Sequence, residues 1–453
     1  MGRGEIETMS DQDIETYIAK HIHDGRADTS SEHENRDRFG EVFTPAVLIN
    51  ELLDALPSYI WSDTSARWLD PAAGTGQFLA LVYARLMRSL SKKIPNLQKR
   101  KTHILEKMLF MVEKNPKNVV ALRRLFGSRT HISLADFLEQ RAKWTRDLGS
   151  TSFHVIAGNP PFQKDKGGAT YKGSAGHQTL WDAFVKEALT GPLLEPCGHL
   201  AFITPANWRR PDNDMYDLMV RDNRLLFLHI YGKAAGQELF GIQNRFDAYV
   251  IERTNPVSQN NVPGKYVSPL CDTEHPPKLL LIDEKGKMRR DIRVETWPFL
   301  PNYAYDQIRK IMVKDPLLGI PILFHSADYD ARRLKKSKTR KFRWPIVHGI
   351  TKKGLTLRYA QERKTTQFGQ SKVLLNFNEK QYPYNDFAGK YGMSQLTFGI
   401  PIRSKREGDR WIKVLTSPKF VEILEATKWS AFQTDYRMFR YFDRELYRKP
   451  FDK

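Results

Sequence analysis

The sequence has little cysteine and no long apolar run. With only Cys197 and Cys271, the chain can form neither a disulfide framework nor a thiolate zinc cage. No apolar run approaches the roughly 18 residues that a membrane-spanning helix needs. The polar stretch from Met1 to Asp13 also lacks the basic and then apolar pattern of a signal peptide. We therefore expect a protein of the cytoplasm or an equivalent reducing interior.

Acidic residues are too few to balance the basic ones. Asp and Glu number 52 against 72 Lys and Arg, so the formal net charge is +20 and the isoelectric point is near 9.7. Such an excess indicates a polyanionic partner, and nucleic acid is the leading candidate. Charge alone does not exclude an ordinary basic protein, so the motifs must decide. A nucleic-acid partner would associate the chain with the nucleoid or the nucleus.

The middle of the chain shows a regular alternation of short apolar runs and amphipathic stretches. The expected strands are 68–70, 109–113, 131–134, 153–157, 200–204, 225–231 and 246–253, and the expected helices are 77–90, 116–126 and 179–189. Strands that alternate with helices predict an α/β fold with a mainly parallel, Rossmann-like sheet covered on both faces. Ligands of such a sheet bind at the carboxyl ends of its strands.

The length of 453 residues suggests two or three domains. Residues 1–38 form a polar N-terminal arm, and the alternating pattern occupies residues 39–255. Residues 256–277, rich in Pro, Asn and Ser, are interpreted as a linker. The alternation is lost over residues 278–453, which are irregular, basic and aromatic and predict a second domain of mixed α+β structure.

The first chemical motif is Asp70-Pro71-Ala72-Ala73-Gly74-Thr75-Gly76, which follows a strand and opens a helix. Its glycines allow a sharp turn and a close approach of the backbone to a ligand. The G-x-G-x-x-G spacing of a dinucleotide site is absent, as is the Lys of a P-loop. An acid directly before the loop favours a cationic cofactor that carries an amino acid, such as S-adenosylmethionine.

Two further strand ends carry acids. Glu113 ends the second strand, where a carboxylate can accept both hydroxyls of a ribose. Asp136 and Phe137 follow the third strand, where Asp can accept an adenine amino group and Phe can pack on the ring. An exposed strand-end Glu and a helix-capping Asp are the ordinary interpretations of such residues. Taken together with the first motif, these residues favour a ligand.

The decisive motif is Gly158-Asn159-Pro160-Pro161-Phe162, directly after the fourth strand. The prolines stiffen the loop and present carbonyl groups without N–H groups. The Asn159 side chain and the Pro160 carbonyl can both accept hydrogen bonds from an amino group, while Phe162 can stack on the ring that carries it. Accepting those hydrogens frees the nitrogen lone pair for attack on a methyl group. This device needs neither a metal nor a covalent intermediate.

The order of these motifs resembles that of the gamma-class N6-adenine DNA methyltransferases of restriction-modification systems, of type II and type IIG. Gly40-Glu41-Val42-Phe43-Thr44-Pro45, before the first motif, resembles the Phe-Thr-Pro element of that family. The resemblance implies a Rossmann-like class I methyltransferase domain, S-adenosyl-L-methionine as cofactor, a C-terminal target-recognition domain and transfer of a methyl group to N6 of a flipped-out adenine in double-stranded DNA. It implies a cofactor site of Thr44, Asp70, Ala72, Gly74, Gly76, Glu113, Asp136, Phe137 and Asn159. It implies a target-base site of Asn159, Pro160, Pro161 and Phe162, with Asn159, Pro160 and Phe162 as the catalytic group.

Some features depart from the family pattern or leave the substrate open. Phe162 stands where Tyr is more frequent, and residues 89–102 look like an inserted basic loop. A Ser at position 159 would be more usual for N4-cytosine enzymes, so Asn159 favours adenine. A C5-cytosine mechanism would need a nucleophile such as Cys197, which we expect in a turn away from the site. A non-catalytic specificity subunit with a relic fold and an N-methyltransferase of RNA or protein are also compatible with the sequence.

Basic residues after the fourth motif are the expected contacts to DNA phosphates. The stretch from Ala331 to Arg343 contains no acid and has Phe342, Trp344 and Tyr359 interleaved or nearby. The residues assigned to DNA are Lys164, Lys166, Arg332, Arg333, Lys335, Lys336, Lys338 and Arg340. A separate cognate restriction endonuclease is an expected partner of such an enzyme.

Overall fold

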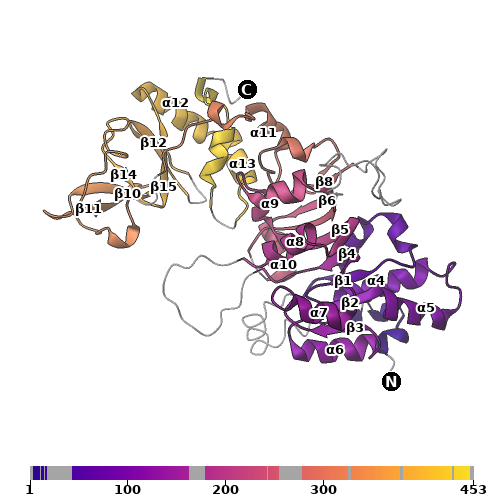
Figure 1. Ribbon diagram of the computed structural model, residues 1–453. Helices are drawn as coiled ribbons and strands as arrows, with labels where there is room; N and C mark the ends of the chain where they lie inside the picture. The colour runs from indigo at the N-terminus through magenta and orange to yellow at the C-terminus, as the bar shows by residue number, and fades with distance from the viewer. Residues whose placement is uncertain are drawn as a thin grey trace, which may run out of the picture. The chain divides into compact units, whose positions relative to one another are not determined.

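The computed structural model divides into two compact units (Figure 1). It describes residues 4–10, 12–14, 16–17, 43–162, 179–241, 243–254, 278–324, 328–377, 381–430 and 433–448. Unit 1 comprises residues 1–206 and 217–292, and unit 2 comprises residues 207–216 and 293–453. The expected linker, 256–277, lies outside the described residues. The structure places the start of the main C-terminal part at 293 instead of 278, because the chain first adds two strands to the sheet of unit 1.

Unit 1 is built on a nine-stranded sheet. Its strands are β1 (Trp68–Asp70), β2 (Leu109–Glu113), β3 (His131–Leu134), β4 (Phe153–Gly158), β5 (Leu194–Pro205), β6 (Arg224–Tyr231), β7 (Phe246–Glu252), β8 (Leu280–Ile282) and β9 (Met288–Arg289). Their order is β3-β2-β1-β4-β5-β7-β6-β8-β9. Strands β3, β2, β1, β4 and β5 are parallel, while β7 runs antiparallel to both β5 and β6. The sheet is thus mainly parallel, as the alternation predicts.

Helices cover both faces of this sheet. They are α3 (Ala46–Asp54), α4 (Gln77–Ser89), α5 (Leu97–His103), α6 (Pro116–Phe126), α7 (Arg141–Leu148), α8 (Trp181–Thr190) and α10 (Lys233–Phe240), with the short helices η1 (Glu5–Glu7), η2 (Ser58–Trp61), η3 (Ile104–Met108) and η5 (Asp217–Arg221). Val155 and Ala157 belong to one hydrophobic cluster with residues of α3, α4 and α6. Ile156, equally buried, points to the other face because successive strand residues alternate.

Most expected elements appear within one or two residues of their predicted limits, but three expectations need correction. The stretch 89–102 is not only a loop, since it contains most of α5. Strand β5 begins at Leu194 instead of Leu200. The described part of the N-terminal arm is not merely polar, because Ile6 and Ile14 are buried in the main cluster of unit 1.

Unit 2 combines two small sheets with helices. The first sheet has the order β11-β10-β14 and the second β13-β12-β15. The strands are β10 (Trp344–Thr351), β11 (Gly354–Ala360), β12 (Lys372–Asn376), β13 (Tyr384–Asp386), β14 (Gly392–Met393) and β15 (Thr397–Pro401). The helices are α9 (Asp214–Tyr216), α11 (Tyr305–Ile311), α12 (Lys405–Leu415) and α13 (Pro418–Ala426), with the short helices η4 (Ala206–Arg209, which begins in unit 1), η7 (Val294–Thr296), η8 (Pro316–Leu318), η9 (Ala331–Arg333), η10 (Tyr436–Tyr441) and η11 (Leu446–Arg448). Across the described parts of both units, no helix is long and apolar enough to cross a membrane.

Candidate functional site

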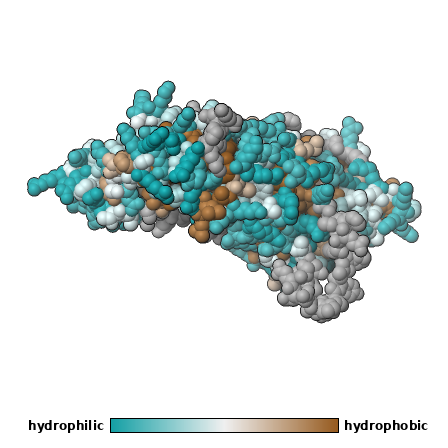
Figure 2. All heavy atoms as spheres, turned by 90° about the horizontal axis from the view of Figure 1, so that it is seen from above, coloured by the Kyte–Doolittle hydropathy of each residue, from teal (hydrophilic) through white to brown (hydrophobic). Residues whose placement is uncertain are grey.

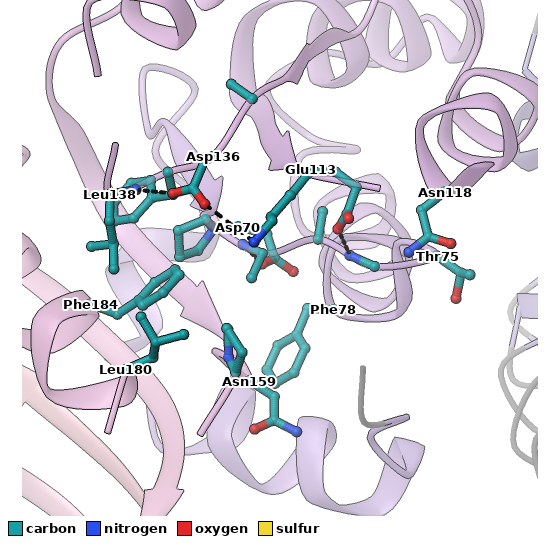
Figure 3. A pocket seen from close by; sticks show the side chains of 18 of the residues that line it. Asp70, Thr75, Phe78, Glu113, Asn118, Asp136, Leu138, Asn159, Leu180 and Phe184 are labelled. Atoms are coloured by element: carbon teal, nitrogen blue, oxygen red, sulfur yellow. Dashed lines mark hydrogen bonds and ion pairs between the residues drawn. The ribbon is translucent and has the colours of Figure 1, made fainter. Parts of the chain in front are cut away.

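A cavity of about 350 Å³ lies in unit 1, where β1, β2, β3 and β4 end (Figure 3). Asp70, Glu113, Ala135 and Asn159 line it, each at or just after the carboxyl end of one of these strands. The sheet order reverses between β1 and β4, and ligands of open α/β sheets bind beside such a reversal. The fold therefore brings together residues that lie up to 89 positions apart in the sequence.

Asp70 places a buried carboxyl group in the wall of this cavity. Its side chain is 2% exposed, and its Oδ1 atom accepts a hydrogen bond from the Ala72 N–H at 3.1 Å. Burial raises the pKa of Asp70 to about 8; the Ala72 hydrogen bond acts in the opposite direction, and the nearby charge of Glu113 raises the pKa further. A carboxyl group in this state gains strongly from a cationic partner.

Glu113 ties the glycine-rich loop to the end of β2. Its Oε2 accepts the Gly74 N–H at 2.7 Å, and its Oε1 accepts the Asn115 N–H at 2.6 Å. Gly74 has a left-handed φ of 53°, a conformation that favours glycine. The side chain of Glu113 thus fixes this loop, and it also lines the cavity.

Asp136 and Phe137 follow β3, as the sequence predicts, but their surroundings are more occupied than expected. Asp136 Oδ1 accepts the Leu138 and Glu139 N–H groups at 3.0 and 3.1 Å, and Lys114 Nζ lies 3.5 Å from its Oδ2. The ring of Phe137 stacks on Trp144 and on Phe184, with centroid distances of 5.3 and 5.1 Å. Asp136 thus shapes the turn while lining the cavity, and Phe137 belongs to an aromatic stack.

Asn159 is held in one orientation by Thr44. Its Nδ2 donates to Thr44 Oγ1 at 3.0 Å, and the Thr44 N–H donates to Gln77 Oε1 at 3.1 Å. Asn159 Oδ1 is buried and has no hydrogen-bond partner among the described residues, and the same is true of Thr75 Oγ1 and Gln77 Nε2. All of these residues line the cavity. Buried polar atoms normally have partners, so this cluster indicates a polar ligand.

The structure brings most of the predicted site residues together. Thr44, Asp70, Ala72, Gly74, Glu113, Asp136, Phe137, Asn159 and Pro161 line the cavity. Gly76, Pro160 and Phe162 do not. Gly76 has a left-handed φ of 92°, and a side chain at this position would also clash with Phe126. Phe162 is partly buried and packs against the hydrophobic cluster of unit 1. Lys164 and Lys166 lie outside the described residues.

Several lining residues were not predicted, including Gln77, Phe78, Lys114, Asn118, Leu138, Leu180 and Phe184. Gln77 and Lys114 directly follow Gly76 and Glu113 in the sequence, so their positions next to predicted site residues could have indicated them. The apolar residues come from helices and loops, where packing in three dimensions decides which side chains face a cavity. Cys197 is not among the lining residues, as expected, and its side chain is 4% exposed.

The predicted DNA-binding cations of the second domain lie in unit 2. The six residues predicted to contact phosphates all have exposed side chains: Arg332, Arg333, Lys335, Lys336, Lys338 and Arg340. Arg332 forms an ion pair with Asp330 at 2.8 Å, whereas the lysines of this stretch have no ion pair among the described residues. The assignment of these residues to DNA stays a prediction.

The sheet order 3-2-1-4-5-7-6 with one antiparallel strand, and a cavity at the ends of the first four strands, define a class I methyltransferase fold. This confirms the expected fold class. Residues 81–235 match the family model described as Eco57I restriction-modification methylase. This match confirms the resemblance to restriction-modification methyltransferases.

Individual proteins are also similar to this chain. An uncharacterized adenine-specific methylase of Mycoplasma pneumoniae is 26% identical over 239 residues, covering 37% of this chain and 55% of the relative. This chain thus spans about half the length of that relative. A cryo-EM structure of a DrdV–DNA complex has a TM-score of 0.50 at 11% identity and covers 98% of this chain and 59% of that chain. The type IIL restriction-modification enzyme MmeI in complex with DNA has a TM-score of 0.47 at 14% identity, covering 95% and 67%. Likeness at these identities concerns the fold alone.

Proposed function

We propose that the chain is an S-adenosylmethionine-dependent DNA methyltransferase that modifies N6 of adenine. The observation that carries this proposal is the unpartnered Oδ1 of Asn159, held by Thr44 at the wall of the cavity within the described part of unit 1. The family match of residues 81–235 and the adenine-specific relative support the same activity.

The cavity fits the expected cofactor in three respects. A buried carboxyl group at Asp70 suits a cationic amino-acid moiety, and the backbone of Ala72 and Gly74 lies beside it. The carboxylate of Glu113 lines the cavity at the end of β2, where the resemblance places the ribose hydroxyls. The apolar side chains of Leu138, Leu180 and Phe184 offer a slot for a planar base, next to Asp136. When bound, the cofactor would supply an activated methyl group.

The residues of the chain would prepare the amine for this transfer. Asn159 Oδ1 and the Pro160 carbonyl would accept hydrogen bonds from the exocyclic amino group, which pushes its nitrogen toward sp3 geometry. Because these acceptors are held in place beforehand, the stabilisation is greatest in the transition state. The adenine must leave the duplex to reach them. In the described state the Phe162 ring packs on unit 1, so stacking on the base would require it to turn.

The test is methyl transfer from tritiated cofactor to duplex DNA, followed by nucleoside digestion and mass spectrometry. We expect N6-methyladenine. N4-methylcytosine would contradict the choice of base, and methylation of RNA or protein alone would contradict the substrate. Cofactor and DNA binding without transfer would instead support a non-catalytic specificity subunit. A separate cognate endonuclease as partner stays a prediction from the sequence.

A further inference from the structure

Trp344, the first residue of β10, carries two arginine side chains on its ring. The Cζ atoms of Arg343 and Arg363 lie 5.2 and 5.5 Å from the centroid of the indole. Arg363 Cζ also lies 5.8 Å from the ring of Phe368, which meets Trp344 edge to face with centroids 5.8 Å apart. Phe368 is buried and Trp344 half-buried, whereas both arginines are exposed. The indole is therefore a platform that holds two guanidinium groups at the surface.

The backbone that presents Arg363 is fixed by the buried Tyr329. The Tyr329 hydroxyl donates to Glu362 O at 3.1 Å and accepts from the Lys364 N–H at 2.7 Å, so it bridges the residues on either side of Arg363. Tyr329 also shares a small hydrophobic cluster with Phe368, against which Trp344 packs. Arg343, in turn, directly precedes β10. Both guanidinium groups thus project from ordered backbone.

The carboxylates near this platform are already engaged elsewhere. Glu362 pairs with Lys364 at 3.2 Å, and Asp330 pairs with Arg332. Asp328 accepts from Thr366 Oγ1 at 2.7 Å and from Gln367 Nε2 at 3.0 Å. Arg343 and Arg363 have no ion pair within the described parts of the chain. Their positive charge is therefore available to an external anion.

More cations stand beside the platform. The backbone of Lys335 pairs with that of Tyr359 on β11, through hydrogen bonds of 3.0 and 2.8 Å, which attaches the basic stretch to this sheet. Lys335 Nζ lies 5.8 Å from the ring of Phe342. The exposed Lys336, Lys338, Arg340 and Lys341 follow in the same loop. Figure 2 shows mostly hydrophilic side chains over the end of unit 2 that carries β10 and β11.

A guanidinium group stacked on an aromatic ring keeps its in-plane N–H donors free, and their forked geometry matches phosphate oxygens. We propose that Arg343 and Arg363, which lie over the ring of Trp344, form a clamp for the sugar–phosphate backbone of duplex DNA. This inference rests on the proposed function, because it takes DNA as the substrate. It assigns to the pair a positioning role that does not depend on base sequence. Arg363 lies outside the basic stretch of the sequence, so only the fold reveals the pair.

The experiment measures duplex binding by the full chain over a range of salt concentrations. The double variant Arg343→Gln/Arg363→Gln is compared with Arg406→Gln/Arg410→Gln, which removes the same charge from the exposed side of α12. We expect the first variant to weaken binding to all duplexes alike and to reduce the slope of log K against log salt by about 2, which corresponds to about one per lost phosphate contact. The control should change both quantities much less. Trp344→Phe should bind more tightly than Trp344→Leu, with thermal unfolding recorded for each.

Three outcomes would overturn the clamp. They are an unchanged salt slope in the double variant, an equal loss in the control, and a loss confined to one DNA sequence, which would mean that the arginines read bases. Failure of the proposed function looks different, since the wild-type chain would then transfer no methyl group to DNA. If the wild type methylates DNA and the double variant binds DNA as tightly as the wild type, the clamp is refuted and the proposed function is not.

Discussion

At the scale of single residues, the Thr44–Asn159 pair is the most informative feature of the site. Thr44 Oγ1 accepts a hydrogen bond from Asn159 Nδ2, which fixes the amide and leaves Oδ1 buried and without a hydrogen-bond partner among the described residues. An asparagine without this partner could turn its amide and present a donor to the target amine. The Phe-Thr-Pro element and the Asn-Pro-Pro motif are thus joined by one hydrogen bond.

Asn159→Ala is expected to reduce kcat about 100- to 1,000-fold, because it removes a preorganised acceptor that matters most in the transition state. Affinity for cofactor and DNA should stay within a few-fold of the wild type. Single-turnover methyl transfer and calorimetry measure these quantities separately. Full activity in this variant would refute the assigned role of Asn159.

Thr44→Val keeps the shape of the side chain and removes the partner of Asn159 Nδ2. We expect kcat to fall by about tenfold, in line with the loss of roughly one hydrogen bond, and Thr44→Ser to restore most of it. In the double variant Thr44→Val/Asn159→Ala, the effect should be that of Asn159→Ala alone, since residues in one hydrogen-bond network are not additive. Additive losses would show that Thr44 acts independently of Asn159.

The raised pKa of Asp70 predicts a pH dependence of cofactor binding. With a pKa of about 8, Asp70 is protonated at neutral pH and must release its proton to pair with a cationic amine. Affinity should therefore rise with pH, by up to about tenfold per unit, until it levels near pH 8. Without cofactor, the contribution of Asp70 to the free energy of unfolding is fully present below the ordinary pKa of an aspartate. This contribution is lost as the pH rises through about 8.

Calorimetry in buffers of different ionisation enthalpy would detect the released proton. Asp70→Asn is the matched control, because any pH dependence that persists in it belongs to the cofactor amine or to other groups. Equal proton release in the wild type and in Asp70→Asn would mean that Asp70 is already ionised before the cofactor binds.

At the scale of elements, the ends of β1 and β4 lie so close that a side chain at position 158 would push against Asp70. A Cβ atom built on Gly158 would lie 2.8 Å from Asp70 Oδ1. Because Gly158 has no side chain, the residue before the Asn-Pro-Pro loop can pack directly against Asp70, the residue that begins the glycine-rich loop. This contact sets the position of Asp70 relative to Asn159.

Gly158→Ala should displace Asp70 and weaken cofactor binding by about 10- to 100-fold, given that overpacking costs about 1–3 kcal/mol. Gly349→Ala is a suitable control, because the nearest atom to a Cβ there lies 3.9 Å away. Thermal unfolding of both variants separates a local effect from loss of the fold. Wild-type affinity in a folded Gly158→Ala variant would show that the loop adapts without cost.

Sequence patterns predicted the elements of unit 1 well where one strong signal acted alone. Strand β2 and helix α6 have the predicted limits, since an apolar run ended by Glu113 and a Pro at the first helical position are local signals. The helical part of 89–102 was missed because basic residues obscured its pattern. The burial of Ile6 and Ile14 was missed because tertiary contacts decide it. Motif residues at strand ends were predictable, while Phe184 and Leu180 required the fold.

At the scale of the whole molecule, the residues that line the cavity all belong to unit 1, whereas the exposed basic stretch and the Trp344 platform belong to unit 2. The residues proposed to catalyse methyl transfer and most of those proposed to contact DNA phosphates therefore belong to different units. Unit 2 offered little to predict from sequence, because its short strands β13 and β14 have three and two residues and show no clear period. Residues 207–216 also belong to unit 2, although they lie between two parts of unit 1 in the sequence, and no sequence pattern predicted this assignment.

This separation predicts that unit 2 chooses the methylated sequence. Exchanging residues 293–453, together with 207–216, for those of a relative should move the modified site while leaving adenine as the modified base. The segment 207–216 must be included because Arg209, which is fully buried, donates to Leu300 O and to Asn302 Oδ1, and would otherwise lose both partners. Cofactor affinity should be unchanged, since no lining residue is replaced. Sequencing that detects modified bases reads out the site. A chimera that binds cofactor normally and still methylates the original site would assign recognition to unit 1.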